Sequence, residues 1–267
     1  MPRVSATIIT LDEAAHIAAA IESVAWADEV IVVDAGSRDE TVAIARAQGA
    51  RVVARDWTGY VDQKNYAASL ASSDWIFSLD ADERVTPALA AEIRTLLASE
   101  PPERGYRVPR VTFHLGRWIR TTDFYPDFQT RLYDRRAARW DGRYVHESVG
   151  VDGGVGQLTG ELQHYSYRDL HDHLDRINRY TTLAARQMHE GGRRAGVFDL
   201  LLHPPAAFLR NYLLRRGVAD GAVGLTLSLI NAYAVFLKFA KLWELQRNPK
   251  TRIPHPASQP RPPEVNS

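Results

Sequence analysis

The chain has 267 residues, of which 45% are hydrophobic and 24% charged, and its formal net charge is +1. This is the composition of a globular protein with a sizeable core, and it gives no sign of bulk nucleic-acid binding. The absence of cysteine excludes disulfides, thiolate metal sites and a cysteine nucleophile. The N-terminal MPRVSATIIT lacks a basic region followed by a long apolar run, so we expect no signal peptide and a cytosolic location.

The first hundred residues alternate between strand and helix patterns. Strands are predicted for residues 4–10, 28–33, 51–54 and 75–79. Helices are predicted for residues 13–24, 39–48, 60–71 and 87–98, the first of them capped by Asp12. Repeated βα units of this length predict an α/β fold with a doubly wound, mostly parallel sheet.

The stretch WIFSLDADERV ends an apolar strand in three carboxylates, Asp80, Asp82 and Glu83. Carboxylates this close raise one another's pKa unless a cation or strong hydrogen bonds compensate. Asp80 and Asp82 can share a hard divalent cation such as Mg²⁺ or Mn²⁺, whereas Glu83 caps or orients the turn. A solvated acidic turn in which Asp80 caps the next helix is the alternative.

A second carboxylate, Asp34, ends the strand of VVDAGSRDET. A capped βα loop explains Ser37 and Asp39 but not Asp34, which can accept a hydrogen bond from a base or a ribose. The sequence has neither G-x-G-x-x-G nor GxxxxGK[ST], so phosphates would depend on a metal. Ligands bind at the carboxyl ends of parallel strands, so Asp34 and Asp80 indicate one shared site.

Residues 104–160 have the texture of hairpin strands and loops, and they contain RWDGRYVHESV. Glu147 in this segment can take a proton from a hydroxyl, although a surface ion pair with Arg143 or Arg131 is the alternative. A helix is predicted for residues 167–190. His171 and His173, two residues apart on it, are expected to be solvated.

The C-terminal part is apolar and basic. Residues 193–252 contain ten Arg and Lys against three acids, a local +7 that leaves about −6 for the remainder. The uncharged run 221–237 is borderline for spanning a bilayer. A helix pair in the headgroup layer is favoured, and a core helix or a spanning helix are the alternatives. We divide the chain into a catalytic domain (1–190), membrane-associating helices (191–247) and a disordered proline-rich tail (248–267).

Four motifs in order, within ATIITLDEA, VIVVDAGSRDETV and QKNYAASLASSDWIFSLDADE, resemble the family 2 glycosyltransferases of GT-A fold. The sequence is most similar to the branch with lipopolysaccharide core β-1,4-glucosyltransferases. The resemblance implies a GT-A type sheet, a UDP-sugar donor, and Mn²⁺ or Mg²⁺. The fold expected for the chain is this sheet followed by the C-terminal amphipathic helices. The family's first motif often reads P-x-Y-N-E, and of this the chain keeps Glu13.

The resemblance also implies roles for individual residues. It implies nucleotide-sugar contacts at Thr10, Glu13, Asp34, Lys64, Asn65 and Asp80. It implies metal ligands at Asp80, Asp82 and His164. The family usually has an E-D pair near the base, and the matching pair here is His146-Glu147, with Glu147 as the base.

We therefore predict a metal-dependent, inverting hexosyltransferase that moves a sugar, with glucose favoured, from a UDP-sugar to a hydroxyl of a lipid-linked glycan such as lipopolysaccharide core. The acceptor side is assigned to His114, Trp118, Arg120, Tyr125 and Arg131. The protein is expected to bind peripherally at the cytoplasmic face of the inner membrane. Alternatives are a polyprenyl-phosphate glycosyltransferase, which needs no base, a non-catalytic nucleotide-sugar-binding membrane protein, and a nucleotidyltransferase, whose Gly-rich basic N-terminal loop is missing.

Overall fold

The computed structural model describes residues 2–142 and 147–248, which form two compact units. The first contains residues 2–111 and 127–165, and the second contains residues 112–126 and 166–248. The sequence-based boundary at residue 190 differs from this division, because the predicted helix 167–190 groups with the C-terminal helices. Except for Asn248, the tail expected to be disordered lies outside the described residues.

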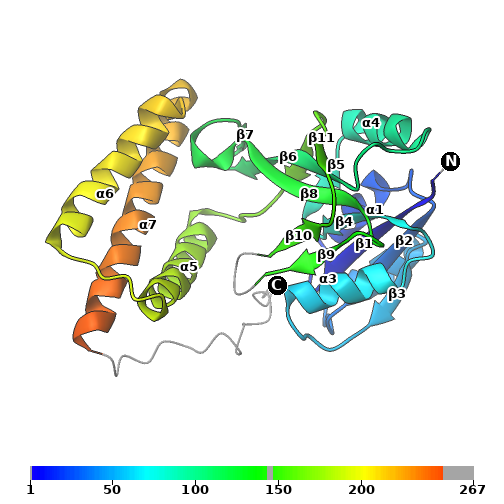
Figure 1. The fold of residues 1–267 in the computed structure, drawn as a ribbon, viewed down its shortest axis with the longest axis horizontal. Helices are drawn as coiled ribbons and strands as arrows, with labels where there is room; N and C mark the ends of the chain where they lie inside the picture. Colours follow the sequence, from blue (N-terminus) through cyan, green and yellow to red (C-terminus); the bar gives the residue numbers. More distant parts are fainter. Residues whose placement is uncertain (1, 143–146, 249–267) are drawn as a thin grey trace. The chain divides into compact units, whose positions relative to one another are not determined.

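The first unit is built on four parallel strands (Figure 1). They are β1 (Val4–Thr10), β2 (Glu29–Asp34), β3 (Arg51–Ala54) and β4 (Trp75–Asp80), in the order β3-β2-β1-β4. The predicted α/β class with a doubly wound parallel core is confirmed, and all four strands lie where the sequence pattern placed them.

Antiparallel strands continue this sheet beyond β4 and carry the residues that complete the site. In sheet order they are β8 (Asp127–Asp134), β6 (Gly105–His114), β12 (Leu162–His164) and β5 (Glu83–Val85). Further strands are β11 (Val155–Gln157), which pairs with β6, and a separate two-stranded sheet of β9 (Ala138–Asp141) and β10 (Ser148–Val151). The expected hairpin texture of residues 104–160 is thus confirmed.

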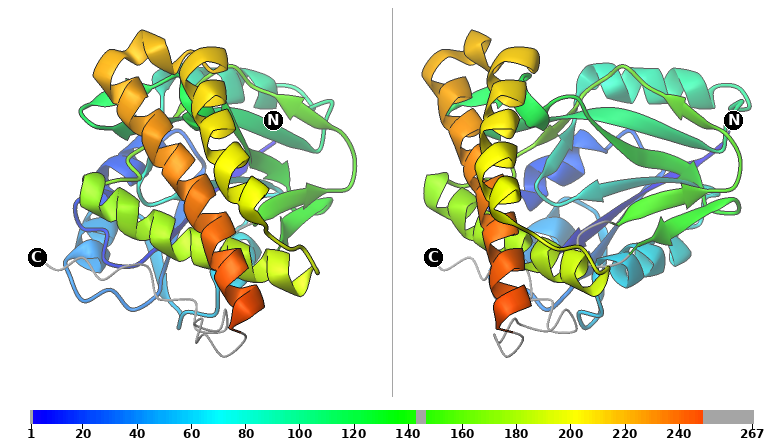
Figure 2. Two further views of the ribbon diagram at one scale, coloured as in Figure 1. Left: turned by 90° about the vertical axis from the view of Figure 1, so that its left-hand side faces the viewer. Right: turned by 60° about the vertical axis from the view of Figure 1, so that its left-hand side comes forward.

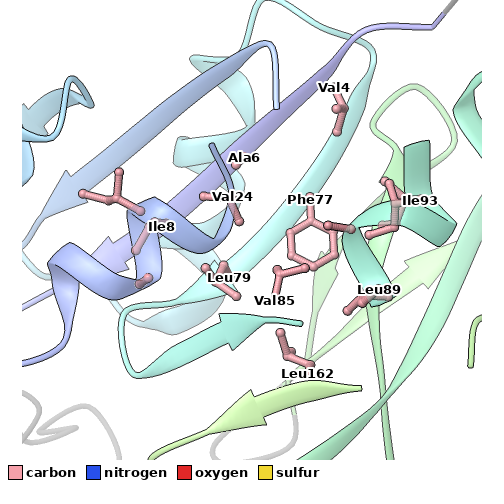
Figure 3. Close-up of a cluster of buried hydrophobic side chains, with 14 of the residues drawn as sticks. Val4, Ala6, Ile8, Val24, Phe77, Leu79, Val85, Leu89, Ile93 and Leu162 are labelled. Atoms are coloured by element: carbon pink, nitrogen blue, oxygen red, sulfur yellow. The ribbon is translucent and has the colours of Figure 1, made fainter. Parts of the chain in front are cut away.

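Both faces of the parallel core are covered, as the apolar strands require. The helices of the first unit are α1 (Ile17–Ser23), α2 (Thr41–Ala47), α3 (Tyr60–Ser69) and α4 (Pro87–Leu97). Alternate side chains of β4 separate between two clusters: Phe77 packs with Leu89 and Ile93 of α4 (Figure 3), whereas Ile76 packs in the cluster of α3. This alternation fixes which face each strand residue occupies, and so which side chains end at the edge.

The second unit is mainly helical. It contains β7 (Arg117–Ile119), α5 (Leu170–Glu190), α6 (Val197–Leu209) and α7 (Gly221–Arg247), with a π-helical turn at Arg210–Leu214. In Figure 2, α6 and α7 lie side by side and α5 crosses α7. A small core formed by residues of α5 and α7 includes Ala185, Phe239 and Leu242.

Gly160 leads into β12 and lies directly against α4. A Cβ at this position would lie 2.4 Å from the Cα of Leu89 and 2.6 Å from its backbone nitrogen. We therefore expect Gly160→Ala to lower the free energy of unfolding by about 1–3 kcal/mol, the usual cost of overpacking. Gly150→Ala is the control, because its nearest neighbour would be 3.9 Å away. Equal denaturant midpoints for the two variants would contradict this packing.

Candidate active site

The carboxyl ends of β1, β2 and β4 meet at one edge of the sheet. Thr10 is in register with Asp34, and Ile9 is in register with Asp80. The prediction that Asp34 and Asp80 lie at one shared edge is therefore confirmed. This is the edge at which open parallel sheets bind ligands.

The loops that follow β1 and β2 are hydrogen-bonded to each other. The backbone N–H of Asp12 donates to Ser37 Oγ at 2.9 Å, and Arg38 N–H donates to Asp12 Oδ1 at 2.7 Å. The N–H of Glu13 donates to Thr41 Oγ1 at 2.8 Å. The expectation that Asp12 caps its own helix is wrong, because α1 begins later and the Asp12 carboxylate is bound by the second loop.

Asp34 is almost fully buried and fixes the shape of its own loop. Its carboxylate accepts hydrogen bonds from the N–H of Gly36 at 3.0 Å and of Ser37 at 3.1 Å, and from the Ser37 hydroxyl. Gly36 has a φ of 96°, which favours glycine there. The contact of Asp34 with a nucleobase stays a prediction.

Two cations hold Asp80. Lys64 Nζ lies 3.0 Å from Asp80 Oδ1, and Arg131 Nη2 lies 2.8 Å from Asp80 Oδ2. Burial raises the pKa of Asp80, but the charges of Arg131 and Lys64 outweigh it and keep that pKa well below the usual range. The repulsion posed by the acidic turn is thus offset in part by side chains of the chain itself.

Glu83 is completely buried beside Asp80. Its Oε1 contacts Arg131 Nη2 at 2.6 Å and Arg110 Nη1 at 3.0 Å, while its Oε2 accepts the backbone N–H of Asp80 at 3.0 Å. The predicted orienting role of Glu83 therefore has a geometric basis. Arg110 also binds Asp127 at 2.6 Å, so the network joins β4, β5, β6 and β8.

Arg131 was assigned to the acceptor side, but its side chain is only 2% exposed. Its position between Asp80 and Glu83 makes it an internal counter-ion, a role that the sequence did not indicate. Within the described residues, its Nε and Nη1 atoms have no hydrogen-bond partner.

Asp82 and His164 form a second pair at this edge. Asp82 Oδ2 lies 3.2 Å from His164 Nε2, and the backbone carbonyl of Asp82 accepts the N–H of Tyr165 at 2.9 Å. Burial raises the pKa of Asp82. The charge and the hydrogen bond of His164 act in the opposite direction, and the pKa of Asp82 lies below its usual value. Both side chains are partly exposed, so they can reach a ligand.

Asp82 and His164 together fit a divalent cation whose remaining ligands come from a bound substrate and from water. Among residues 2–142 and 147–248, no group of three or more His, Asp or Glu is arranged as a complete metal site. Mg²⁺ usually binds through one or two carboxylates together with substrate phosphates and water. Asp82 and His164 would therefore hold such an ion together with a diphosphate, whereas both oxygens of Asp80 are already bound by cations.

Glu147 lies beside this network. Its Oε1 is 3.9 Å from Lys64 Nζ, the same ammonium that binds Asp80. Burial raises the pKa of Glu147, and this effect exceeds the opposing effect of Lys64. A carboxylate with a raised pKa is suited to accept a proton. Of the other residues named for this segment, Arg143 and His146 lie outside the described residues.

Asn65 is bound to the protein backbone. Its amide nitrogen donates to the Trp140 carbonyl at 2.9 Å, and its amide oxygen accepts the Trp140 N–H at 3.0 Å. Lys64, the preceding residue, lies over the Trp140 ring at 4.2 Å. Asn65 therefore anchors β9, the strand that precedes Glu147 in the chain, and its contact with a nucleotide stays a prediction.

The other predicted acceptor residues, His114, Trp118, Arg120 and Tyr125, belong to the second unit, and their role stays a prediction. His114 is buried, with its Nε2 3.0 Å from Nδ1 of His173. The expectation that His173 is solvated is wrong, because its buried ring contacts the rings of His114, Phe124 and Tyr167. Burial, and then the neighbouring His114, lower the pKa of His173 to about 4. His171 is exposed, as expected.

Comparison with known proteins decides the family. The model of glycosyl transferase family 2 matches residues 5–150. An uncharacterized glycosyltransferase of Rickettsia felis is 35% identical over 91% of this chain and 90% of its own. The chain belongs to glycosyl transferase family 2. The lipopolysaccharide core biosynthesis glycosyltransferase LpsC of Rhizobium meliloti is 33% identical over 90% of this chain and 92% of its own.

Among solved structures, this glycosyltransferase is similar to glucosyl-3-phosphoglycerate synthase from Mycobacterium tuberculosis, in complex with Mn²⁺, uridine-diphosphate and phosphoglyceric acid. The TM-score is 0.49, with 19% identity over 73% of this chain and 80% of that one. The family assignment rests on the sequence matches and not on this structural likeness.

The contacts of Asn65 predict an effect on turnover. Asn65→Ala would leave the Trp140 N–H and carbonyl without their partner and loosen β9, the strand that precedes Glu147 in the chain. We expect kcat for sugar transfer to fall by at least about tenfold, while KM for the donor changes little. The control is Ser69→Ala, an exposed position on the same helix. A raised donor KM with unchanged kcat would instead place Asn65 at the nucleotide.

Proposed function

We propose that this glycosyltransferase moves a sugar from a UDP-sugar to a hydroxyl of a lipid-linked glycan, with inversion at the anomeric carbon. The observation that carries the proposal is the position of Lys64, which contacts both Asp80 at 3.0 Å and Glu147 at 3.9 Å. One buried ammonium thus joins the carboxylate at the nucleotide edge to the candidate base. The similarity to LpsC supports a lipopolysaccharide core acceptor, and glucose is the favoured sugar.

The donor nucleoside would bind against the two bonded loops. Thr10 ends β1 there, and its buried hydroxyl has no partner among the described residues. Glu13 lies on the first loop and Asp34 at the base of the second. These loops are hydrogen-bonded to each other, so their conformation is fixed before the donor arrives, which reduces the entropic cost of binding.

Asp82 and His164 would hold the divalent cation, either Mn²⁺ or Mg²⁺. When bound, such an ion offsets the negative charge on the leaving diphosphate. Asp80 keeps Lys64 and Arg131 in place at the same edge. The chain thereby compensates the charge of Asp80 internally, while Asp82, whose partner is His164, would be left to the added cation.

Glu147 would act as the base for the acceptor. As the acceptor oxygen forms its bond to the anomeric carbon, Glu147 takes the hydroxyl proton, and the bond to the diphosphate oxygen breaks with its electron pair leaving on UDP. The base and the leaving group are on opposite sides of the sugar, which gives inversion. Lys64 lies close enough to bind the carboxylate and keep it oriented.

A membrane acceptor agrees with the C-terminal part of the chain. Residues 217–247 contain a helix long and apolar enough to cross a bilayer, and only 28% of its most apolar 18-residue stretch is buried. We place the protein as a peripheral enzyme at the cytoplasmic face of the inner membrane. This is the side on which UDP-sugars and the inner leaflet would both be accessible to it.

The base assignment predicts the effect of Glu147→Gln. We expect kcat to fall by about 10²–10⁴ with donor binding retained, because the amide cannot take a proton. Transfer would be measured with UDP-glucose and a lipid-linked acceptor, and Asp152→Asn, an exposed site, is the control. Full activity of Glu147→Gln would indicate an acceptor that is already an anion, such as a polyprenyl phosphate.

The raised pKa of Glu147 predicts a pH dependence. A raised pKa means that Glu147 takes up a proton at a higher pH than an ordinary glutamate, so the base form is lost earlier on acidification. We therefore expect kcat to fall on acidification at a higher pH than an ordinary glutamate would give. In Glu147→Asp we expect a lower maximal kcat and a shift in the pH at which kcat falls on the acid side. If that pH is unchanged, another group is responsible for the titration.

The metal site predicts the effect of Asp82→Asn. We expect a loss of Mn²⁺ binding in the presence of UDP, measured by calorimetry, together with a loss of transfer of at least about a hundredfold. His164→Ala should weaken Mn²⁺ binding less, since the carboxylate remains. Asp62→Asn, on the exposed side of α3, is the control. Mn²⁺ affinity that is equal in the wild-type protein and Asp82→Asn would exclude this metal site.

A further inference from the structure

The helices α6 and α7 expose apolar side chains over much of their length. On α6 these include Leu201, Leu202 and Leu209, each more than half exposed, and on α7 they include Leu225, Leu229 and Phe236. We call this surface the apolar face. Exposed apolar surface of this extent on a folded chain marks an interaction site.

The apolar face follows the helical repeat. Leu225, Leu229 and Phe236 are spaced at i, i+4 and i+11, so they form one stripe along α7. Leu227, on the other side of the helix, is buried. The two helices lie side by side (Figure 2), so one partner can contact the exposed surface of both.

The opposite side of α7 is bound to a polar helix. Lys241 Nζ contacts the Asn178 carbonyl at 2.6 Å, the Thr181 hydroxyl at 2.9 Å and the Thr182 hydroxyl at 2.7 Å, all on α5. That helix also carries Asp172 and several arginines. A bilayer-spanning α7 would draw these groups into hydrocarbon, at a high cost in free energy.

Basic residues flank α6 and α7 in the chain. Residues 193–247 contain eight Arg and Lys against three acids, a net charge of +5. Arg193 and Arg194 precede α6, Arg215 and Arg216 follow it, and Arg247 ends α7. A second copy of the chain on this face would bring two sets of positive charges together, whereas an anionic bilayer would attract them.

We propose that α6 and α7 lie in the plane of an anionic membrane surface, with the apolar face in the headgroup layer and no helix crossing the bilayer. The proposal deepens the proposed function, since it names how the enzyme reaches a lipid-linked acceptor. Its chemistry is general: leucine and phenylalanine side chains enter the interface, and arginines bind lipid phosphates.

Vesicle flotation of the full-length protein tests the surface. We expect binding to phosphatidylcholine vesicles that contain phosphatidylglycerol, and weak binding without it. Leu202→Ser with Leu229→Ser should lower the partition coefficient by at least about tenfold. Leu170→Ser with Leu174→Ser, equally apolar exposed positions on α5, should leave it unchanged. Equal binding of both double variants, or a face variant that changes only the oligomeric state, would overturn the proposal.

The charge contribution is tested separately. Arg194→Ala and Arg216→Ala should each reduce binding to the anionic vesicles about fivefold, with a smaller effect at high salt. Binding that is indifferent to both substitutions and to phosphatidylglycerol would contradict an anionic partner.

The chain has no cysteine, so single labels can report depth. A fluorophore at Leu229→Cys should be quenched most by nitroxides near the headgroup, and one at Arg179→Cys, an exposed position on α5, should not be quenched. Strongest quenching of the Leu229→Cys label by nitroxides at the bilayer centre would indicate a spanning helix and overturn the in-plane arrangement.

Hydrolysis of the UDP-sugar without vesicles separates this inference from the proposed function. The face variant should retain hydrolysis while losing membrane binding. Loss of hydrolysis in Glu147→Gln with normal flotation would concern the active site alone. Wild-type protein that floats but does not use any UDP-sugar would refute the donor assignment and leave the membrane surface intact.

Discussion

Charge compensation at the end of β4 is the constraint on which the candidate site depends. Arg131 is buried, and a single nitrogen of its guanidinium binds both Asp80 and Glu83. A buried carboxylate without a counter-ion costs several kcal/mol, so the acidic turn and Arg131 can exist in the interior only together. Since Glu83 also accepts the backbone N–H of Asp80, the same network fixes the main chain of the turn. The edge is therefore shaped before any ligand binds.

Three carboxylates around this network acquire different properties from their surroundings. Asp80 has two cationic partners, which keep its pKa well below the usual range. Asp82 has His164 as its partner in place of Lys64 and Arg131, so the chain compensates less of its charge. Burial has the largest effect on the pKa of Glu147, so this pKa is raised, whereas that of Asp80 is lowered. Separation of the pKa values of neighbouring carboxylates is how one site can bind charge and also accept a proton.

The parts of the fold that follow from local periodicity could be predicted from the sequence. The β1, β2 and β4 strands are apolar runs that end in a polar residue, and chain order alone placed Asp34 and Asp80 at one edge. The contact between Asp80 and Arg131 could not be predicted, because Arg131 belongs to a strand added later in the chain. Arg131 reaches Asp80 only because β8 pairs antiparallel with β4, and nothing in FQTRLYDRR distinguishes it from a surface arginine. The prediction that Asp12 caps its own helix failed for a similar reason, because the partner of Asp12 lies on the loop after β2.

The distribution of charge along the chain gives the C-terminal helices a significance that the total net charge hides. A net charge of +1 would attract the protein only weakly to an anionic surface. At physiological ionic strength, interactions between exposed charges are screened beyond roughly 8 Å, so each region responds to a membrane through its own local charge. Residues 193–247, at +5, can be attracted even though the remainder is acidic. The acidic remainder in turn suits the proposed donor site, where carboxylates would bind a divalent cation. The same asymmetry would thus meet two opposite electrostatic requirements in separate parts of one chain.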